Sequence, residues 1–375
     1  MNYHNDAEEG QAKQHNKKKH RFLKILTLSL AFVLVISIIS SVSVASVLAI
    51  VKVFFVSVLS LLIVLVFMVI VSPVPVALIV RFAFRNGPAV APENYEEIAA
   101  AVTSIKDLSY PSEYKDNTAD IFIPKNQKGK TPVVLWVHGG AFVGGSKKDV
   151  EIYATMLASE GIAVISINYQ RAPEAKYPVP IMQTEEAYRW LVDISDKYDI
   201  DISRIILAGD SAGAHIVSQF ATVQTSEEYA EKMGMEQVMP VDTLKAVVLF
   251  CGPFDVESIN KTDNSILDFL LGRTAWAYFG IKNWADDFSE QVAVLNHITA
   301  DFPPTFISDG NTYSFEDHGR SLADILAGKG VPVEVFFVPA DEKKIMHEYQ
   351  FIMNTDVGQD SFRKTVNFMK KYIGE

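Results

Sequence analysis

The 375-residue chain is poor in the residues that mark specialised scaffolds. It contains one cysteine, Cys251, which excludes a disulfide framework and leaves no C-x-x-C metal motif. Its 20 glycines and 16 prolines are too few for a collagen-like or low-complexity chain. Basic residues are fewer than acidic ones, with 34 Lys and Arg and 45 Asp and Glu. Proteins that bind nucleic acids usually carry an excess of positive charge, whereas this chain has a net charge of −11. We therefore expect no nucleic-acid partner.

Metal and dinucleotide motifs are missing as well. The eight histidines show no H-x-x-x-H spacing. The stretch Gly139–Gly144 matches the dinucleotide fingerprint G-x-G-x-x-G too loosely to indicate such a site. The sequence therefore predicts neither a metal nor a cofactor.

Charge is nearly absent between Ile25 and Val80, where Lys52 is the only charged residue. A transmembrane helix needs about 20 apolar residues, so this run is long enough for two. A core helix rarely stays apolar on every face over such a length, and cleavage of a signal peptide would leave a second apolar segment that still inserts. We expect a membrane anchor over residues 22–80, with two helices near 23–43 and 50–72 in the lipid bilayer.

Positive charge flanks this anchor at both ends. Residues 1–21 form a basic tail whose cluster Lys17–Arg21 should stay in the cytoplasm by the positive-inside rule. Two helices would return the chain to that side, where Arg81 and Arg85 obey the same rule. We expect an integral protein of the cell membrane with its acidic body in the cytoplasm. A single long tilted helix would place that body outside.

The body alternates between strand-like and helical patterns. Residues 81–118 indicate a linker with one short helix near Glu96–Lys106, and the alternation fills 119–375. It predicts an α/β fold with a mostly parallel central sheet and helices on both faces. Residues 256–297 interrupt it as a helical insertion. The expected strands are Ile121–Ile123, Val133–Val137, Ala163–Asn168, Arg204–Ala208, Ala246–Phe250, Thr305–Ser308 and Val333–Val338. The expected helices span 148–160, 179–198, 212–224, 314–329 and 358–372.

One short motif carries nucleophile chemistry. Gly209-Asp210-Ser211-Ala212-Gly213 fits the pattern G-x-S-x-G, with a strand-like run before it and a helical pattern after it. In that setting a tight turn exposes the serine hydroxyl, and the glycines permit close backbone approach. The positive end of the helix dipole lies beside the hydroxyl. Ser211 is therefore the candidate nucleophile.

A glycine-rich turn, His138-Gly139-Gly140-Ala141-Phe142, follows the strand-like run Val133–Val137. A loop of this kind at a strand end frees backbone N–H groups to point at one spot. Acyl transfer needs such donors for the oxyanion of its tetrahedral intermediate. The turn is a candidate oxyanion hole.

The two motifs resemble those of the hormone-sensitive-lipase-like family of α/β-hydrolases, the α/β-hydrolase fold-3 group. Tyr169–Glu174 reads YQRAPE and resembles the family stretch Y-R-x-A-P-E. His347–Phe351 reads HEYQF and lies where the family has its catalytic histidine. The resemblance covers about residues 119–372. It implies an α/β-hydrolase fold and an esterase or lipase that cleaves small-molecule esters through Ser, His and an acid, without a cofactor.

Site roles follow from the same resemblance. It implies that Ser211 is the nucleophile and His347 the general base. It also implies oxyanion donors from the N–H groups of Gly140, Ala141 and Ala212. Gly139 would shape the loop.

The third triad member departs from the family pattern. The family places its acid just past the seventh strand, where this chain has Tyr313. Nearby acids are Asp309, Glu316 and Asp317. Ser314 as a helix N-cap would engage Asp317 in a variant of the capping box. The longer side chain of Glu316 could reach the histidine, so we rank Glu316 first, then Asp317 and Asp309.

Three functions fit these features. The first is a membrane-anchored ester hydrolase, and the second is an amidase or peptidase with the same triad. The third is a catalytically weak or silent, membrane-tethered ligand-binding protein. Ser211 and His347 favour the enzymes, and Tyr313 favours the silent protein. The substrate, its acyl chain length and the oligomeric state stay open.

Overall fold

The computed structural model describes residues 20–37, 47–240, 242–262, 264–284 and 289–374. It divides into two compact units, Met1–Pro75 and Val76–Glu375.

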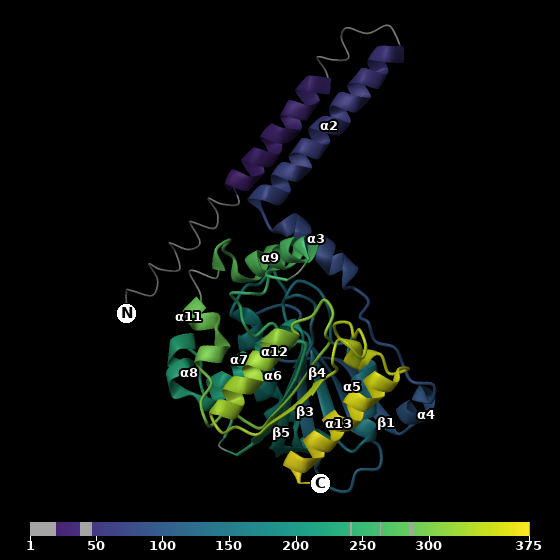
Figure 1. The fold of residues 1–375 in the computed structure, drawn as a ribbon, viewed down its shortest axis with the longest axis vertical. Helices are drawn as coiled ribbons and strands as arrows, with labels where there is room; N and C mark the ends of the chain where they lie inside the picture. Colours follow the sequence, from purple (N-terminus) through teal and green to yellow (C-terminus); the bar gives the residue numbers. More distant parts are fainter. Residues whose placement is uncertain (1–19, 38–46, 241, 263, 285–288, 375) are drawn as a thin grey trace. The chain divides into compact units, whose positions relative to one another are not determined.

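The amino-terminal unit holds a helix at His20–Ser37 and helix α2 at Val47–Val71. Both are long and apolar enough to cross a membrane. Within this unit they run side by side (Figure 1), and the hydroxyls of Ser37 and Ser57 lie 3.2 Å apart. The tail at 1–19 and the turn expected between the two helices lie outside the described residues.

The second unit is built on an eight-stranded sheet with the order β1-β2-β4-β3-β5-β6-β7-β8. The pairs β1–β2 and β2–β4 are antiparallel, and the other five are parallel. The mostly parallel sheet is therefore confirmed. Its strands are β1 (Val102–Ser109), β2 (Thr118–Pro124), β3 (Thr131–Val137), β4 (Ala163–Ile167), β5 (Ile200–Asp210), β6 (Leu244–Phe250), β7 (Thr305–Asp309) and β8 (Val333–Phe337).

Helices cover both faces of the sheet, as the alternation predicts (Figure 1). They are α3 (Val74–Ala83), α4 (Tyr95–Ala100), α5 (Glu151–Ser159), α6 (Val179–Ile194), α7 (Ala212–Thr225), α8 (Glu227–Met233), α9 (Ser265–Phe279), α11 (Ser289–Val292), α12 (Glu316–Gly328) and α13 (Asp356–Ile373). On one face Phe362 of α13 packs on Tyr153 of α5, and Phe368 of α13 packs on Phe306. The next strand residue, Ile307, faces Gly319 of α12. Because successive strand side chains point to opposite faces, α12 and α13 cover opposite sides of the sheet.

The segment before the sheet differs from the expected linker. The helix expected near Glu96–Lys106 ends at Ala100, and β1 begins at Val102. β1 is an edge strand with mostly exposed side chains, so it lacks the apolar alternation that marks a strand in a sequence. Residues 76–80 of α3, expected in the anchor, belong to the second unit. The described part of the insertion contains helices α9 and α11 as well as turns.

Candidate active site

Ser211 lies on the sharp turn that joins β5 to α7. Its backbone has φ +49° and ψ −118°, a conformation that non-glycine residues rarely adopt. A Cβ on Gly213 would come within 2.0 Å of the Val137 carbonyl oxygen, so only glycine permits this packing of helix on sheet. The turn presents the serine hydroxyl at the carboxyl edge of the parallel strands.

His347 comes from the loop after β8 and meets this hydroxyl. Its Nε2 lies 3.0 Å from Ser211 Oγ, and its Nδ1 lies 2.7 Å from Ser314 Oγ. Ser314 in turn donates its hydroxyl proton to the carboxylate of Asp309. With that direction set, His347 Nδ1–H donates to Ser314, and Nε2 is free to accept the proton of Ser211. This is the tautomer that a general base needs.

Asp309, at the end of β7, is the carboxylate that this hydrogen-bond chain reaches. Burial raises its pKa to about 7, although the bond from Ser314 acts in the opposite direction. Burial also lowers the pKa of His347 to about 4, so the imidazole is neutral near pH 7. The chain Ser211–His347–Ser314–Asp309 therefore has an uncharged base at its centre.

The structure does not bring Glu316 to the histidine. Its carboxylate accepts a hydrogen bond from Arg320 Nε at 2.8 Å, one turn along α12. Tyr313 carries no carboxyl group, is 61% exposed and has φ at +51°. Helix α12 begins at Glu316, and the hydroxyl of Ser314 contacts His347 and Asp309 instead of capping it. Sequence reasoning missed Ser314 as a partner of the base because a serine near a helix start is usually a cap.

The glycine-rich turn wraps beside Ser211 with an unusual backbone. Gly140, Ala141 and Phe142 all have positive φ, at +111°, +53° and +63°. A Cβ on Gly140 would come within 2.4 Å of the Gly144 backbone. The N–H of Gly139 donates to Asp210 Oδ2 at 2.8 Å, and this hydrogen bond fixes the glycine-rich turn to the end of β5.

Three other N–H groups remain available near the Ser211 hydroxyl. Among the described residues, the N–H groups of Gly140, Ala141 and Ala212 donate to no carbonyl. Ala141 and Ala212 line the cavity that also contains Ser211 and His347. Free donors at such a position can stabilise an oxyanion.

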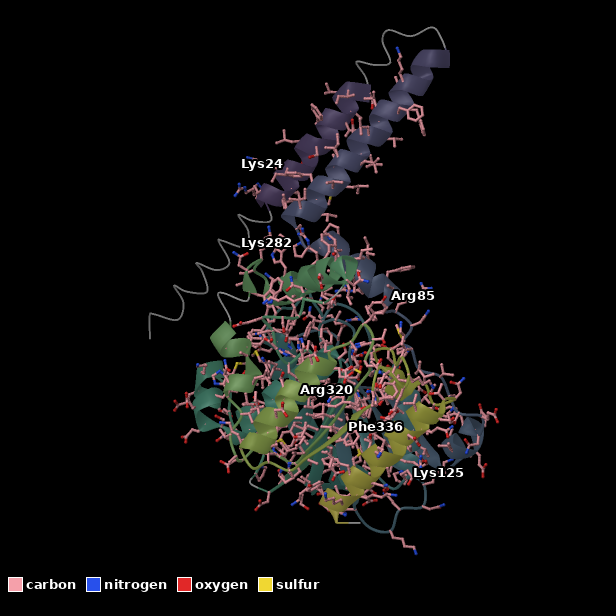
Figure 2. All side chains as sticks on the ribbon, in the orientation of Figure 1. Lys24, Arg85, Lys125, Lys282, Arg320 and Phe336 are labelled. Carbon is pink, nitrogen blue, oxygen red and sulfur yellow. The ribbon has the colours of Figure 1, made fainter. Side chains whose placement is uncertain are left out.

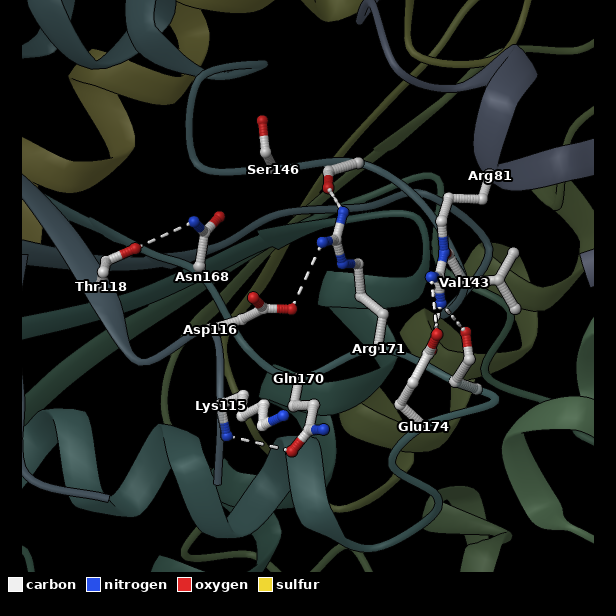
Figure 3. Close-up of polar contacts among 12 residues, drawn as sticks. Arg81, Lys115, Asp116, Thr118, Val143, Ser146, Asn168, Gln170, Arg171 and Glu174 are labelled. Carbon is white, nitrogen blue, oxygen red and sulfur yellow. Dashed lines mark hydrogen bonds and ion pairs between the residues drawn. The ribbon is translucent and has the colours of Figure 1, made fainter. Parts of the chain in front are cut away.

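The stretch Tyr169–Glu174 packs against the glycine-rich turn. Tyr169 stacks on His138 with ring centroids 4.5 Å apart and donates its hydroxyl to the His138 carbonyl oxygen at 3.1 Å. Arg171 donates to the Gly145 carbonyl oxygen at 2.8 Å (Figure 3). Burial lowers the pKa of His138 to about 3, so this ring stays neutral. His138 therefore serves the loop's structure.

A pair of buried carboxyl groups flanks Ser211 and His347, and sequence reasoning missed it. Asp210 precedes the serine, and Glu348 follows the histidine. Trp136 Nε1 donates to Asp210 at 2.8 Å. Burial raises the pKa of Asp210 to about 7, and burial together with the neighbouring Asp210 raises the pKa of Glu348 well above its usual range. Two adjacent carboxyls in this setting keep a proton between them. The signal in the sequence was their position next to the two candidate residues, Ser211 and His347.

The fold also gathers Cys251, Asp309 and His347, whose potential ligand atoms lie within 4.8 Å of one another. No spacing rule finds this trio because its members come from three separate segments. Hydrogen bonds already engage them. The thiol of Cys251 accepts from the N–H of Glu348 at 3.3 Å and donates to Gln350 Oε1 at 3.4 Å. The trio is therefore explained as part of the polar network around the base.

Two cavities meet at the candidate triad. An apolar cavity of about 460 Å³ opens on Ser211 and His347 between α3 and α9. A more polar cavity of about 650 Å³ shares Tyr313–Phe315 with it. The apolar cavity is walled by Val80, Ala83, Phe84, Pro88, Phe142, Ile259, Leu267, Leu270, Leu271 and Ala275.

Comparison with known proteins identifies the family and the fold. The BD-FAE family matches residues 119–320. The chain is a member of the BD-FAE family of α/β-hydrolases. This BD-FAE chain is 32% identical over 227 residues to a putative alpha/beta hydrolase R526 of Acanthamoeba polyphaga mimivirus, which covers 59% of this chain and 62% of the relative. It is 28% identical to esterase LipI of Mycobacterium tuberculosis, with 56% and 63% covered. The chain thus spans about three fifths of the length of these two relatives.

Solved structures show the same fold for this BD-FAE chain. Esterase B from Lactobacillus rhamnosis superposes with a TM-score of 0.63 at 20% identity, over 78% of this chain and 90% of that one. A bacterial heroin esterase superposes with a TM-score of 0.60 at 22% identity, over 73% and 86%. The expected α/β-hydrolase fold and the hormone-sensitive-lipase-like resemblance are confirmed.

Proposed function

We propose that the chain is a membrane-anchored carboxylic ester hydrolase with Ser211 as its nucleophile. The observation that carries the proposal is the 3.0 Å approach of Ser211 Oγ to Nε2 of a neutral His347, beside the free N–H groups of Ala141 and Ala212. Relatives named esterase and carboxylesterase support the reaction class. The ester is a small molecule whose two parts occupy the apolar and polar cavities.

The proposed reaction begins with Ser211 Oγ attacking the ester carbonyl carbon while its proton passes to His347 Nε2. Negative charge builds on the carbonyl oxygen, where the N–H groups of Gly140, Ala141 and Ala212 stabilise it. His347 then gives the proton to the departing alkoxide, which leaves an acyl group on Ser211. Water, deprotonated by the same imidazole, releases the acid and restores the serine.

Ser314 and Asp309 take the place of the triad acid in this proposal. When His347 becomes a cation, its Nδ1–H donates to Ser314 Oγ, and the Ser314 hydroxyl donates to the Asp309 carboxylate. Each bond polarises the next, so the negative charge of Asp309 acts on the imidazole through the hydroxyl. Ser314 and Asp309 are positioning residues that act through His347.

Labelling of the full-length chain with a fluorophosphonate tests the proposal. We expect the wild type to be labelled and to hydrolyse para-nitrophenyl acetate, butyrate and octanoate. Ser211→Ala should abolish both, and His347→Ala should reduce both. A folded wild-type chain that is neither labelled nor active would contradict the proposal and favour a ligand-binding role. Faster turnover of the matching anilides than of the esters would favour an amidase.

A further inference from the structure

We infer that the outer faces of α3 and α9 rest in a lipid bilayer and that ester substrates enter the apolar cavity from the lipid phase. The inference rests on the proposed function and names its substrate class. These are uncharged esters in which an apolar acyl or alkyl chain is joined to a polar part. Such molecules partition into a bilayer rather than into water.

Helix α3 has the polarity of a helix that faces lipid. Nine of its ten residues are apolar, and its only charged residue is Arg81. Arg81 turns toward the protein and donates to the Val143 carbonyl oxygen at 2.6 Å and to Glu174 Oε1 at 3.0 Å (Figure 3). A helix on a water-facing surface shows the opposite arrangement, with its charges outward.

The outward face of α3 is fully apolar. Ile79 and Phe82 are 63% and 67% exposed, and Leu78, one turn before Phe82, is 46% exposed. The opposite face, with Val76 and Val80, is buried. Exposed apolar residues that gather in one patch mark an interaction surface.

Helix α9 extends this patch on the other side of the cavity. Its outward residues include Ile266, which is 74% exposed, and Phe269. The guanidinium carbon of Arg85 lies 4.8 Å from the ring centroid of Phe82. That of Arg273 lies 5.1 Å from the ring centroid of Phe269. Figure 2 shows Arg85 at the end of α3. Guanidinium groups beside apolar rings suit the boundary between acyl chains and lipid phosphates.

The chain itself limits how far this patch can lie from a membrane. Helix α2 ends at Val71, and α3 begins at Val74. Three peptide units reach at most about 11 Å. If α2 crosses a bilayer, α3 must start within that distance of the bilayer surface. A water-facing apolar helix at that place would cost free energy that contact with lipid removes.

The cavity connects this face to the nucleophile. Val80 and Ala83 of α3 and Leu270 of α9 line its walls, and Ser211 and His347 lie at its inner end. A chain from the lipid phase would pass between the two helices and place its ester carbonyl at the serine. The polar cavity beyond Ser314 leaves room for the alcohol.

The first test compares two substrates with full-length protein reconstituted in phosphatidylcholine vesicles. The variant Ile79→Ser/Phe82→Ser changes the outer face and no cavity residue. We expect its turnover of water-soluble para-nitrophenyl acetate to stay within about two-fold of wild type, and its turnover of bilayer-dissolved para-nitrophenyl palmitate to fall roughly ten-fold. The matched control is Val335→Ser on β8, which is 49% exposed and outside the patch. It should change neither rate. An equal fall with both substrates, or no fall with palmitate, would overturn the inference.

The second test needs no activity. Cys251 is buried, so a cysteine introduced at position 79 by Ile79→Cys can be labelled selectively with a nitrobenzoxadiazole dye. We expect blue-shifted emission that nitroxide-bearing phosphatidylcholine quenches, whereas the same dye after Val335→Cys stays in water. Equal quenching at both positions, or protection of position 79 by a second copy of the chain, would overturn the inference. Loss of acetate turnover in the wild type would contradict the proposed esterase without affecting this measurement.

Discussion

At the scale of single residues, Ser314 has the most unusual position. It lies between His347 and Asp309, where a serine hydrolase usually has direct contact between imidazole and carboxylate. The Ser314 hydroxyl can both accept from His347 Nδ1–H and donate to the Asp309 carboxylate. It stays neutral and links the imidazole to the negative charge of the carboxylate. Glu316 is instead engaged by Arg320.

Removing the Ser314 hydroxyl should slow proton transfer by His347. We expect Ser314→Ala and Asp309→Asn each to lower kcat by roughly 100-fold, because a general base that is poorly oriented loses a factor of this order. Ser314→Thr keeps the hydroxyl and should recover most of the rate. The control Glu316→Gln should stay within about two-fold of wild type. Turnover of para-nitrophenyl acetate measures each. A loss with Glu316→Gln as large as with Asp309→Asn would return the role to Glu316.

The same residues predict a pH profile. His347 must be neutral to act as a base, so kcat/KM should rise as pH increases through about 4. Asp309 has its pKa near 7, so ionisation of its carboxyl should add a second rise through about that pH. Asp309→Asn should remove only the upper rise. Rates with a neutral, water-soluble ester from pH 3 to 9 measure both. A single rise that is unchanged in Asp309→Asn would contradict this assignment.

At the scale of elements, the site is held by contacts between loops and helices. Asp210 joins the end of β5 to the glycine-rich turn through Gly139, and Glu348 lies beside it from the loop that carries His347. Arg81 ties α3 to the Val143 carbonyl oxygen and to Glu174. The cavity wall and the base are thus positioned by a few polar contacts.

The carboxyl pair should make stability depend on pH. Burial raises both pKa values, so the folded chain keeps a proton that the unfolded chain releases above about pH 4 to 5. The free energy of unfolding should therefore fall as pH rises from about 5 to 8. Glu348→Gln keeps a hydrogen-bond donor without that proton, so its decline should be smaller. Urea midpoints of the full-length chain in detergent, followed by tryptophan fluorescence, measure it. The exposed Glu342→Gln serves as control, and an equal decline in both variants would contradict the shared proton.

Arg81 should matter for substrate binding. We expect Arg81→Met to raise KM for para-nitrophenyl butyrate by roughly ten-fold with little change in kcat, because α3 supplies the cavity walls Val80 and Ala83 but no reacting group. Arg85→Met, which removes a charge outside the cavity, is the matched control. A fall in kcat at constant KM would mean that α3 acts on the triad itself.

At the scale of the whole molecule, the chain couples an apolar amino-terminal unit to a hydrolase unit. If both helices span the bilayer, the hydrolase unit lies on the same side as the amino terminus. A reporter fused after Glu375 should then give a cytoplasmic signal. An extracellular or periplasmic signal would mean that only one helix crosses.

Much of this molecule follows from local sequence. The alternation of apolar runs with helical patterns predicted the sheet and its covering helices, because strands buried on both faces are continuous apolar runs, whereas helices that cover a sheet are apolar on one side only. Ser211 and the glycine-rich turn at Gly139 and Gly140 were evident because strained turns demand particular residues. The sequence did not predict β1, since an exposed edge strand lacks a run of apolar residues.

Only the tertiary structure decided what His347 touches. Asp309 ends β7 and Ser314 follows it, whereas His347 follows β8. Between Asp309 and Ser314, Tyr313 has φ +51° and is 61% exposed. Glu348 meets Asp210 across a gap of more than a hundred residues for the same reason. A local pattern specifies which way a segment folds, whereas contacts between distant loops depend on turn geometry and burial that no single segment encodes.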